Sequence, residues 1–140
     1  MLDVVTAAAQ HPSSADEPGF DQIDAEKCRS FQHAVELVGK KWTAAILLAG
    51  MRGARRFVEY RAHVAGISDR LLAQRLKELE AEHLIERTVV PTTPVLVTYR
   101  PSERAQGLMR ALHPLVAWSQ EDSARRQVDV RPEGAGLGSR

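Results

Sequence analysis

Three polar side chains at helical spacing hold the clearest potential for chemistry in this sequence. Arg70, Gln74 and Lys77 lie in the stretch GISDRLLAQRLKELEAEHLIERTVV, residues 66–90. At about 100° per residue they share one face of a helix. Guanidinium and amide groups can make paired hydrogen bonds to base edges, and an ammonium group attracts phosphate. The face therefore has the chemistry of nucleic-acid recognition; the alternative is a solvated helix face without a partner.

The single cysteine, Cys28, is a second candidate for chemistry. It is expected near the start of a helix, between Lys27 and Arg29, where the helix dipole and the cations favour the reactive thiolate. Oxidation can join it only to Cys28 of another chain or to a small thiol. The alternative is a small apolar residue packed at a dimer seam. One cysteine excludes an intramolecular disulfide and is typical of a reducing compartment.

Charge is distributed unevenly along the 140 residues, although the formal net charge is only +1. Residues 1–27 carry six Asp and Glu against one lysine, whereas residues 40–104 carry twelve Lys and Arg against seven Asp and Glu. The middle of the chain therefore favours an anionic partner. The start of the chain does not read as a secretion signal, and the apolar runs fall far short of the roughly 20 residues of a membrane span. We expect a cytoplasmic protein without a membrane partner.

Several elements are needed to position the basic helix. Apolar residues recur at helical spacing in three segments before it, residues 25–38, 40–51 and 55–64. The second of these helices is expected to bury four residues, Trp42, Ala45, Ile46 and Ala49. Ser68 is expected to cap the basic helix, since its hydroxyl can accept a hydrogen bond from a free backbone N–H. Three leucines should face the core, Leu72, Leu76 and Leu79.

Two strands and a long helix follow. Residues 84–90 and 95–100 are rich in β-branched residues and flank a proline-bounded turn, which predicts an antiparallel hairpin. Ser102 should cap the last helix, and Pro114 should kink it. The apolar face of that helix contains Leu108, Met109, Leu112, Leu115 and Val116. The first and last helices present more apolar surface than a small domain can cover, so we expect both to pack against a second chain.

Short helices, a capped basic helix and a hairpin follow the order of a winged helix-turn-helix. The predicted fold class is α+β, mainly α, with dimerisation helices at both ends. We expect this domain to span residues 25–126, between a flexible acidic arm, residues 1–24, and a flexible tail, residues 127–140. A helix about 10–12 Å across fits a major groove about 12 Å wide, and the hairpin can reach the neighbouring backbone or minor groove.

Three segments of the sequence, ELVGKKWTAAILLAGMRGARRFVEY, GISDRLLAQRLKELEAEHLIERTVVPTTPVLVTYRPSERAQGL and HPLVAW, resemble the HxlR-type transcriptional regulators, relatives of the MarR group. The resemblance covers about residues 28–118. It implies a homodimeric winged-helix protein whose recognition helices enter successive major grooves of a near-palindromic operator. By position it assigns DNA contacts to six residues, Ser68, Arg70, Gln74, Arg75, Thr92 and Thr93.

Some positions leave roles open or depart from the family pattern. Arg75 lies at the edge of the buried face by angle, so it can bond phosphate or brace a neighbouring helix. Asp69 replaces a residue that is often uncharged, and its expected role is to complement the positive helix end. Pro101 and Ala105 replace an apolar residue and a glycine, which puts the packing of the wing against the last helix in question. Several members of the family sense oxidants or electrophiles through a cysteine at the position of Cys28.

We interpret the sequence as a sequence-specific DNA-binding regulator, expected to be a repressor and responsive to oxidants through Cys28. Arg70 and Gln74 would discriminate bases. Phosphate attraction would come from five cations, Lys40, Lys41, Arg55, Arg56 and Lys77. The alternatives are a protein-interaction module and a regulator with a small-molecule ligand in the dimer cleft. The histidines lack metal-site spacing and no catalytic motif is present, so we expect no enzyme activity, metal or cofactor.

Overall fold

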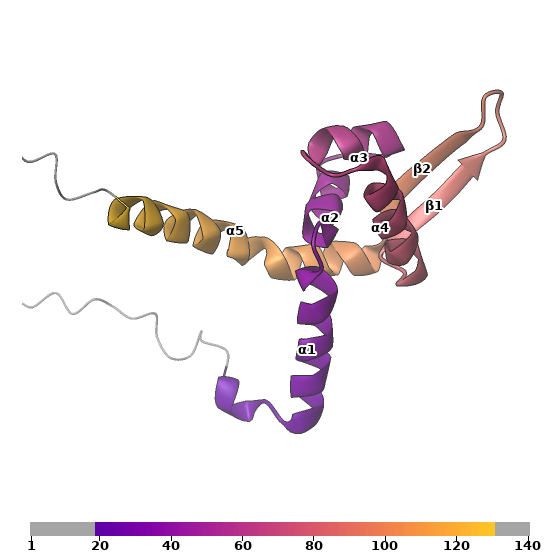
Figure 1. Cartoon of the computed structure of the whole chain (residues 1–140). Coiled ribbons are helices and arrows are strands. Elements are labelled where there is room, and N and C mark those ends of the chain that lie inside the picture. Colours follow the sequence, from indigo (N-terminus) through magenta and orange to yellow (C-terminus); the bar gives the residue numbers. More distant parts are fainter. Residues whose placement is uncertain (1–18, 131–140) are drawn as a thin grey trace, which may run out of the picture. The chain divides into compact units, whose positions relative to one another are not determined.

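The computed structural model describes residues 19–130, which divide into two units, residues 19–39 and residues 40–130. In its described part the first unit contains a 3-10 helix, η1 (Phe20–Gln22), and α1 (Ala25–Gly39). The second unit contains α2 (Thr43–Met51), α3 (Phe57–His63), α4 (Asp69–Ala81), β1 (Ile85–Val90), β2 (Leu96–Pro101) and α5 (Glu103–Asp129) (Figure 1). This order confirms the predicted, mainly helical winged helix-turn-helix.

The predicted domain limits differ in detail from these elements. The segment predicted as a flexible arm, residues 1–24, contains η1 at its end, and α5 continues beyond residue 126 to Asp129. The remainder of the predicted arm, residues 1–18, and most of the predicted tail, residues 131–140, lie outside the described residues.

The buried face of α2 differs from the predicted one. Ile46 and Ala49 are buried as predicted, but Ala45 is exposed and Trp42 is only half-buried. The reason is that Trp42 precedes the helix in a left-handed conformation, with φ of 77°. α2 therefore begins at Thr43, three residues after the predicted start, and Trp42 does not belong to the helical repeat that defines its buried face. Its buried residues are Thr43, Ile46, Leu47, Ala49 and Gly50.

The cap and the core face of α4 agree with the prediction. The Leu71 backbone N–H donates to the Ser68 hydroxyl at 3.2 Å, which satisfies one of the free donors of the first turn. The three predicted leucines, Leu72, Leu76 and Leu79, are all buried. Their burial fixes which way α4 faces, because a rotation about its own axis would expose them to water.

The hairpin is antiparallel, with a register that runs from Ile85 opposite Pro101 to Val90 opposite Leu96. Its base is attached to the helices through Tyr99. The Tyr99 N–H donates to the Arg55 carbonyl at 2.7 Å, and the Tyr60 hydroxyl donates to the Tyr99 carbonyl at 2.9 Å. Burial raises the pKa of Tyr60 to about 12, so the hydroxyl keeps the proton that it donates.

The last helix begins at the predicted cap and remains partly uncovered. The Ser102 hydroxyl accepts from the Ala105 N–H at 3.1 Å and donates to the His83 carbonyl at 2.7 Å. Pro114 lies inside α5, and Figure 1 shows the two halves of this helix running in slightly different directions. Leu115 and Val116 are 54% and 47% exposed in the second unit. In the first unit, Phe31 of α1 is 66% exposed.

Candidate nucleic-acid interface

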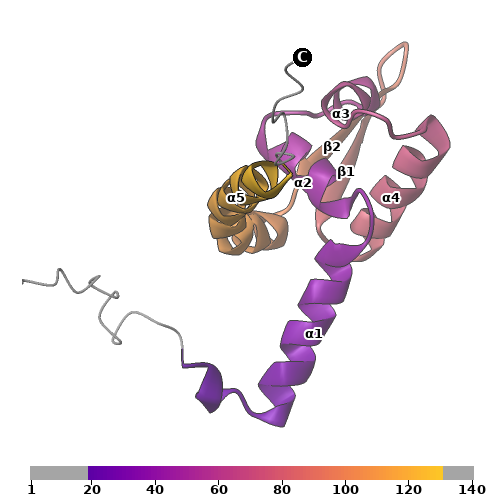
Figure 2. The ribbon, with the colours of Figure 1, turned by 60° about the vertical axis from the view of Figure 1, so that its left-hand side comes forward.

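The polar face of α4 is open to solvent. Arg70, Gln74 and Lys77 are all exposed, whereas the leucines on the opposite side of the helix are buried. Figure 2 shows α4 at the outer edge of the second unit, with the hairpin between it and α2. A capped helix whose free face carries two long cations and an amide can enter a groove without displacing any other element.

Two residues at the start of α4 are arranged to accept a nearby anion. Ser68 caps the first turn and is exposed. The Asp69 carboxylate is paired with Arg61 of α3, whose Nη1 lies 3.1 and 3.0 Å from its two oxygens. This pairing offsets the negative charge that would otherwise repel phosphate at the helix start. It also ties α3 to α4, which sequence spacing does not reveal because eight positions separate the partners.

Arg75 is positioned as a brace between α4 and the segment before α2. Its side chain is only 12% exposed. Its Nε donates to the Lys41 carbonyl at 3.1 Å, and its Nη1 donates to the Glu78 carboxylate at 3.0 Å. Of the two roles left open by the sequence, the brace fits this geometry, because these bonds already engage the guanidinium.

The five cations expected to attract phosphate differ in availability. Lys40 Nζ lies 2.9 Å from Glu78 Oε2, and Lys41 Nζ lies 5.1 Å from the centroid of the Trp42 ring. Arg55 is partly buried and donates to the carbonyls of Gly50 and Ala54 at 2.9 and 2.7 Å. Arg56 and Lys77 are exposed and have no side-chain ion pair within the described residues. Arg55 is therefore the least available of the five for phosphate.

The wing tip presents small polar groups. Thr92 and Thr93 are both exposed. The Thr92 hydroxyl donates to the Pro94 carbonyl at 2.8 Å, so this side chain stiffens the turn. Thr93 is the freer of the two for an external contact.

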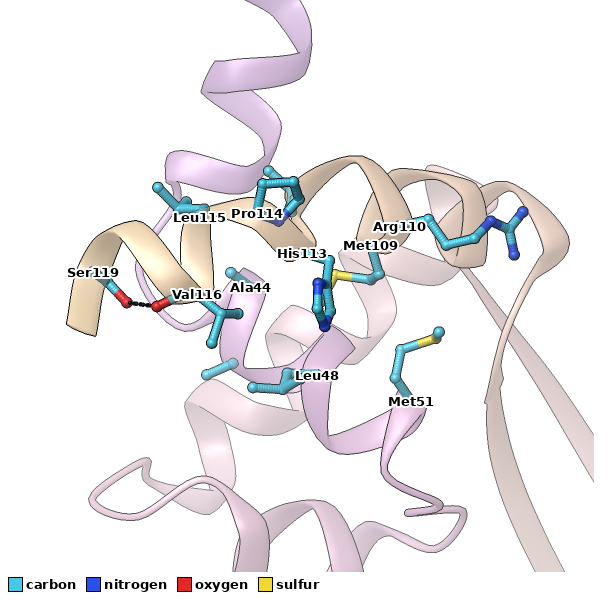
Figure 3. Close-up of a pocket in the computed structure, with 12 residues that line it drawn as sticks. Ala44, Leu48, Met51, Met109, Arg110, His113, Pro114, Leu115, Val116 and Ser119 are labelled. Atoms are coloured by element: carbon cyan, nitrogen blue, oxygen red, sulfur yellow. Dashed lines mark hydrogen bonds between the residues drawn. The ribbon is translucent and has the colours of Figure 1, made fainter. Parts of the chain in front are cut away.

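An apolar groove of about 710 Å³ lies between α2 and α5. Leu48 and Met51 of α2 and Met109 and Val116 of α5 face its interior, with His113 among them (Figure 3). Ala45, which was predicted to be buried and is exposed, lines this groove and so lies in apolar surroundings on the surface. The groove is lined by residues of α2 and α5 and by none of α4, and it presents a different chemistry from the polar face of α4.

Cys28 lies exposed in the first turn of α1. The Asp24 carboxylate accepts from the Lys27 N–H at 2.8 Å and so caps this helix. In residues 19–130 no group of three His, Cys, Asp or Glu side chains is arranged to hold a metal ion. No helix of that region has the length and hydropathy to cross a membrane.

Glu78 contacts three of the predicted site residues but is not among the residues expected from the sequence. It accepts hydrogen bonds from Gln74 and Arg75 and pairs with Lys40. Glu78 lies four residues after Gln74 and three after Arg75, and this spacing predicts the two contacts, since such positions are neighbours on a helix. The contact with Lys40 depends on tertiary structure.

Comparison with known proteins identifies the family. Residues 37–127 match the model described as HxlR-like helix-turn-helix. The chain is 36% identical over 96 residues to the uncharacterized HTH-type transcriptional regulator YvaP of Bacillus subtilis, covering 69% of this chain and 89% of YvaP. The solved structure of the reduced transcriptional regulator YodB from B. subtilis is similar, with 37% identity and a TM-score of 0.61 over 67% of this chain and 92% of that one.

A second structure, diamide-treated YodB, has 37% identity and a TM-score of 0.59, and covers 67% of this chain and 93% of that one. The matched relatives are named as transcriptional regulators, which agrees with the prediction that the chain is not an enzyme. The exposed polar face of α4, the hairpin beside it and these matches lead to one assignment. The chain belongs to the HxlR-like helix-turn-helix family of DNA-binding transcriptional regulators.

Proposed function

We propose that this regulator acts as a homodimeric repressor whose two α4 helices enter successive major grooves of one operator. The observation that carries the proposal is the exposed row of Arg70, Gln74 and Lys77 on a capped helix held by buried leucines. A dimer with two-fold symmetry matches a near-palindromic site, because each subunit meets an equivalent half-site. Repression follows when the operator overlaps the binding site of the polymerase.

The dimer is proposed to form through α1 and α5. Each helix has large apolar side chains exposed in its own unit, among them Phe31 and Val35 on α1 and Leu115 and Val116 on α5. The groove between α2 and α5 adds apolar surface beside that of α5. Burial of such surface stabilises association by about 25 cal/mol per Å² before the costs of binding. A second copy supplies the same helices and so covers both surfaces at once.

Within this complex the residues that contact DNA divide into two groups. Arg70 and Gln74 read base edges in the major groove. Ser68, Lys77, Arg56 and Thr93 contact the backbone, and Lys41 adds positive charge near α4. Arg75 keeps its bracing role, and Arg55 contributes mainly to the fold.

Arg70→Ala tests the reading face directly. We expect a loss of about 1–3 kcal/mol at one base position, because a bidentate contact to that base disappears. The measurement is selection of bound DNA from a random pool, followed by titration of the selected duplex and of single-base variants. Lys77→Ala is the matched control: it should weaken binding to all duplexes alike and reduce the salt slope by about one. If Arg70→Ala leaves both affinity and sequence preference intact, the reading face is misassigned.

We also propose that Cys28 makes operator binding responsive to oxidants. The support is the exposed thiol in the first turn of α1, together with the similarity to YodB, of which a diamide-treated structure exists. In the reaction two thiols, one from Cys28 and one from a partner chain or a small thiol, lose two hydrogens to diamide and form a disulfide. Strain or displacement at α1 then alters the dimer and releases DNA.

The oxidant response is tested by diamide treatment of the wild type and of Cys28→Ser. The wild type should lose operator affinity by about tenfold or more, a coupling of typical size for such regulators, and dithiothreitol should restore it. Cys28→Ser should bind DNA equally well before and after treatment, because serine forms no disulfide. Equal responses of the two proteins would exclude Cys28 as the sensor without affecting the assignment of α4.

A further inference from the structure

One carboxylate on α4, that of Glu78, holds three neighbouring side chains. Its Oε1 accepts from Gln74 Nε2 at 3.2 Å, and its Oε2 lies 2.9 Å from Lys40 Nζ and 3.0 Å from Arg75 Nη1. Arg75 in turn donates to the Lys41 carbonyl. Glu78 thus joins a base-reading side chain, a surface cation and the brace that fixes α4 to the preceding segment.

The contact with Gln74 fixes which way its amide group is turned. A carboxylate only accepts hydrogen bonds, so it selects the orientation in which the NH₂ group of Gln74 faces Glu78. One N–H and the carbonyl oxygen then remain for DNA in a fixed order. A glutamine reads adenine with this donor and acceptor pair, and reversal of the amide would reverse the pattern. Glu78 therefore selects one of the two patterns that Gln74 can present.

The ion pair with Glu78 makes the positive charge of Lys40 less available to phosphate. Lys40 is half exposed, at 50% of its side-chain surface, and its ammonium group can reach solvent or DNA once released. The pKa of the Glu78 carboxyl is held below its ordinary value, chiefly by the hydrogen bond from Lys40. The carboxylate is thus ionised at neutral pH and partly neutralises the cation. The ion pair therefore weakens the part of DNA binding that comes from phosphate attraction and does not depend on base sequence.

We propose that Glu78 is a positioning residue that sets the sequence specificity of α4, by orienting the Gln74 amide and by restraining Lys40. The inference rests on the proposed DNA-reading role of α4 and deepens it. Specificity is a difference between affinities, so a residue can raise it by weakening binding to the wrong sequences. Glu78 strengthens binding to the operator by orienting Gln74 and weakens binding to other sequences by restraining Lys40, without itself contacting DNA.

Glu78→Gln tests the proposal with little change in shape. The new amide can donate as well as accept, so it no longer selects one orientation of Gln74, and it leaves Lys40 unpaired. We expect affinity for random duplex to rise and its salt slope to steepen by about one, because one more cation is available to phosphate. The ratio of operator to random affinity should fall by about tenfold, with the preference relaxed at the base that Gln74 reads.

The matched control is Glu80→Gln on the same helix. Glu80 is exposed and has no side-chain hydrogen bond or ion pair in the described part of the chain, so this change removes the same charge without releasing a partner. It should raise both affinities together and leave their ratio unchanged. A second variant, Lys40→Ala combined with Glu78→Gln, should lose the gain in random-duplex affinity, which identifies Lys40 as its source.

The outcomes separate this inference from the proposed function. If the wild type itself does not distinguish operator from random duplex, the DNA-reading role of α4 fails. If the wild type discriminates and Glu78→Gln changes the ratio no more than Glu80→Gln does, the positioning role is overturned while the reading face stands. Thermal unfolding of each variant shows whether the helix itself is intact, so a loss of fold cannot be mistaken for a loss of specificity.

Discussion

Replacement of Val116 by aspartate is expected to yield a monomer that binds the operator about a hundredfold or more weakly than the wild type does. Val116 lines the groove between α2 and α5 and is 47% exposed in a single chain. In the proposed dimer an aspartate there would lose its water without gaining a partner, and burial of an unpaired charge is very costly. A monomer engages one half-site at a time and loses the gain of about 10²–10⁴ that linked half-sites provide.

The control for this variant is Ala111→Asp, which adds the same charge to α5 at an exposed position outside the groove, on roughly the opposite side of the helix from Val116. Analytical ultracentrifugation gives the mass of each variant, and titration of the selected operator gives its affinity. Ala111→Asp should remain dimeric and bind like the wild type. A dimeric Val116→Asp protein would place the interface elsewhere, and a monomer with wild-type operator affinity would overturn the need for a dimer.

Local signals in the sequence predicted the part of the site that depends on one helix. The cap at Ser68 and the buried face of Leu72, Leu76 and Leu79 follow from residue type and helical period, and both are present. Because those leucines fix the orientation of α4, the exposure of Arg70 and Gln74 followed as well. The antiparallel hairpin was predictable for the same reason, since proline and β-branched residues mark its turn and strands.

Features that depend on contacts between elements were not predictable in this way. The sequence predicts Ala45 in the core because the apolar stripe is counted from Trp42, and the left-handed conformation that keeps Trp42 out of α2 cannot be read from residue types. Arg55 and Lys40 were counted as free cations, yet one bonds backbone carbonyls and the other pairs with Glu78. The sequence shows which side chains are charged, but the groups to which they bond depend on the tertiary fold.

The structure also links the helix proposed to dimerise with the helix proposed to read DNA. The Ser102 hydroxyl at the start of α5 donates to the His83 carbonyl, just after α4, and Arg104 donates to the Glu82 carbonyl. These bonds satisfy carbonyls beyond the end of α4 and fix its direction relative to the first turn of α5. In the proposed dimer the packing of α5 would then help to set the separation of the two α4 helices, which connects dimer geometry to half-site spacing.

Alanine in place of glycine is expected to have opposite effects on stability at two helical positions. At Gly50, in α2, an added Cβ would lie 2.6 Å from Pro101 Cγ and 2.9 Å from the Tyr60 hydroxyl oxygen. Neither neighbour can move easily, because the Pro101 ring is rigid and buried and the Tyr60 hydroxyl is bonded to the Tyr99 carbonyl. Gly50→Ala should therefore lower the free energy of unfolding by about 1–3 kcal/mol, despite the better helix propensity of alanine.

Gly107, in α5, provides the matched comparison. There the nearest atom to an added Cβ is the flexible Arg110 guanidinium at 3.8 Å, an ordinary contact. Gly107→Ala should raise the free energy of unfolding by about 0.5–1 kcal/mol, because only the helix propensity changes. Urea unfolding at one fixed protein concentration measures both, since association contributes to apparent stability. Two changes of the same sign would contradict the close packing of Gly50 against Pro101. This contact joins the end of β2 to α2, at the position where Pro101 departs from the family pattern.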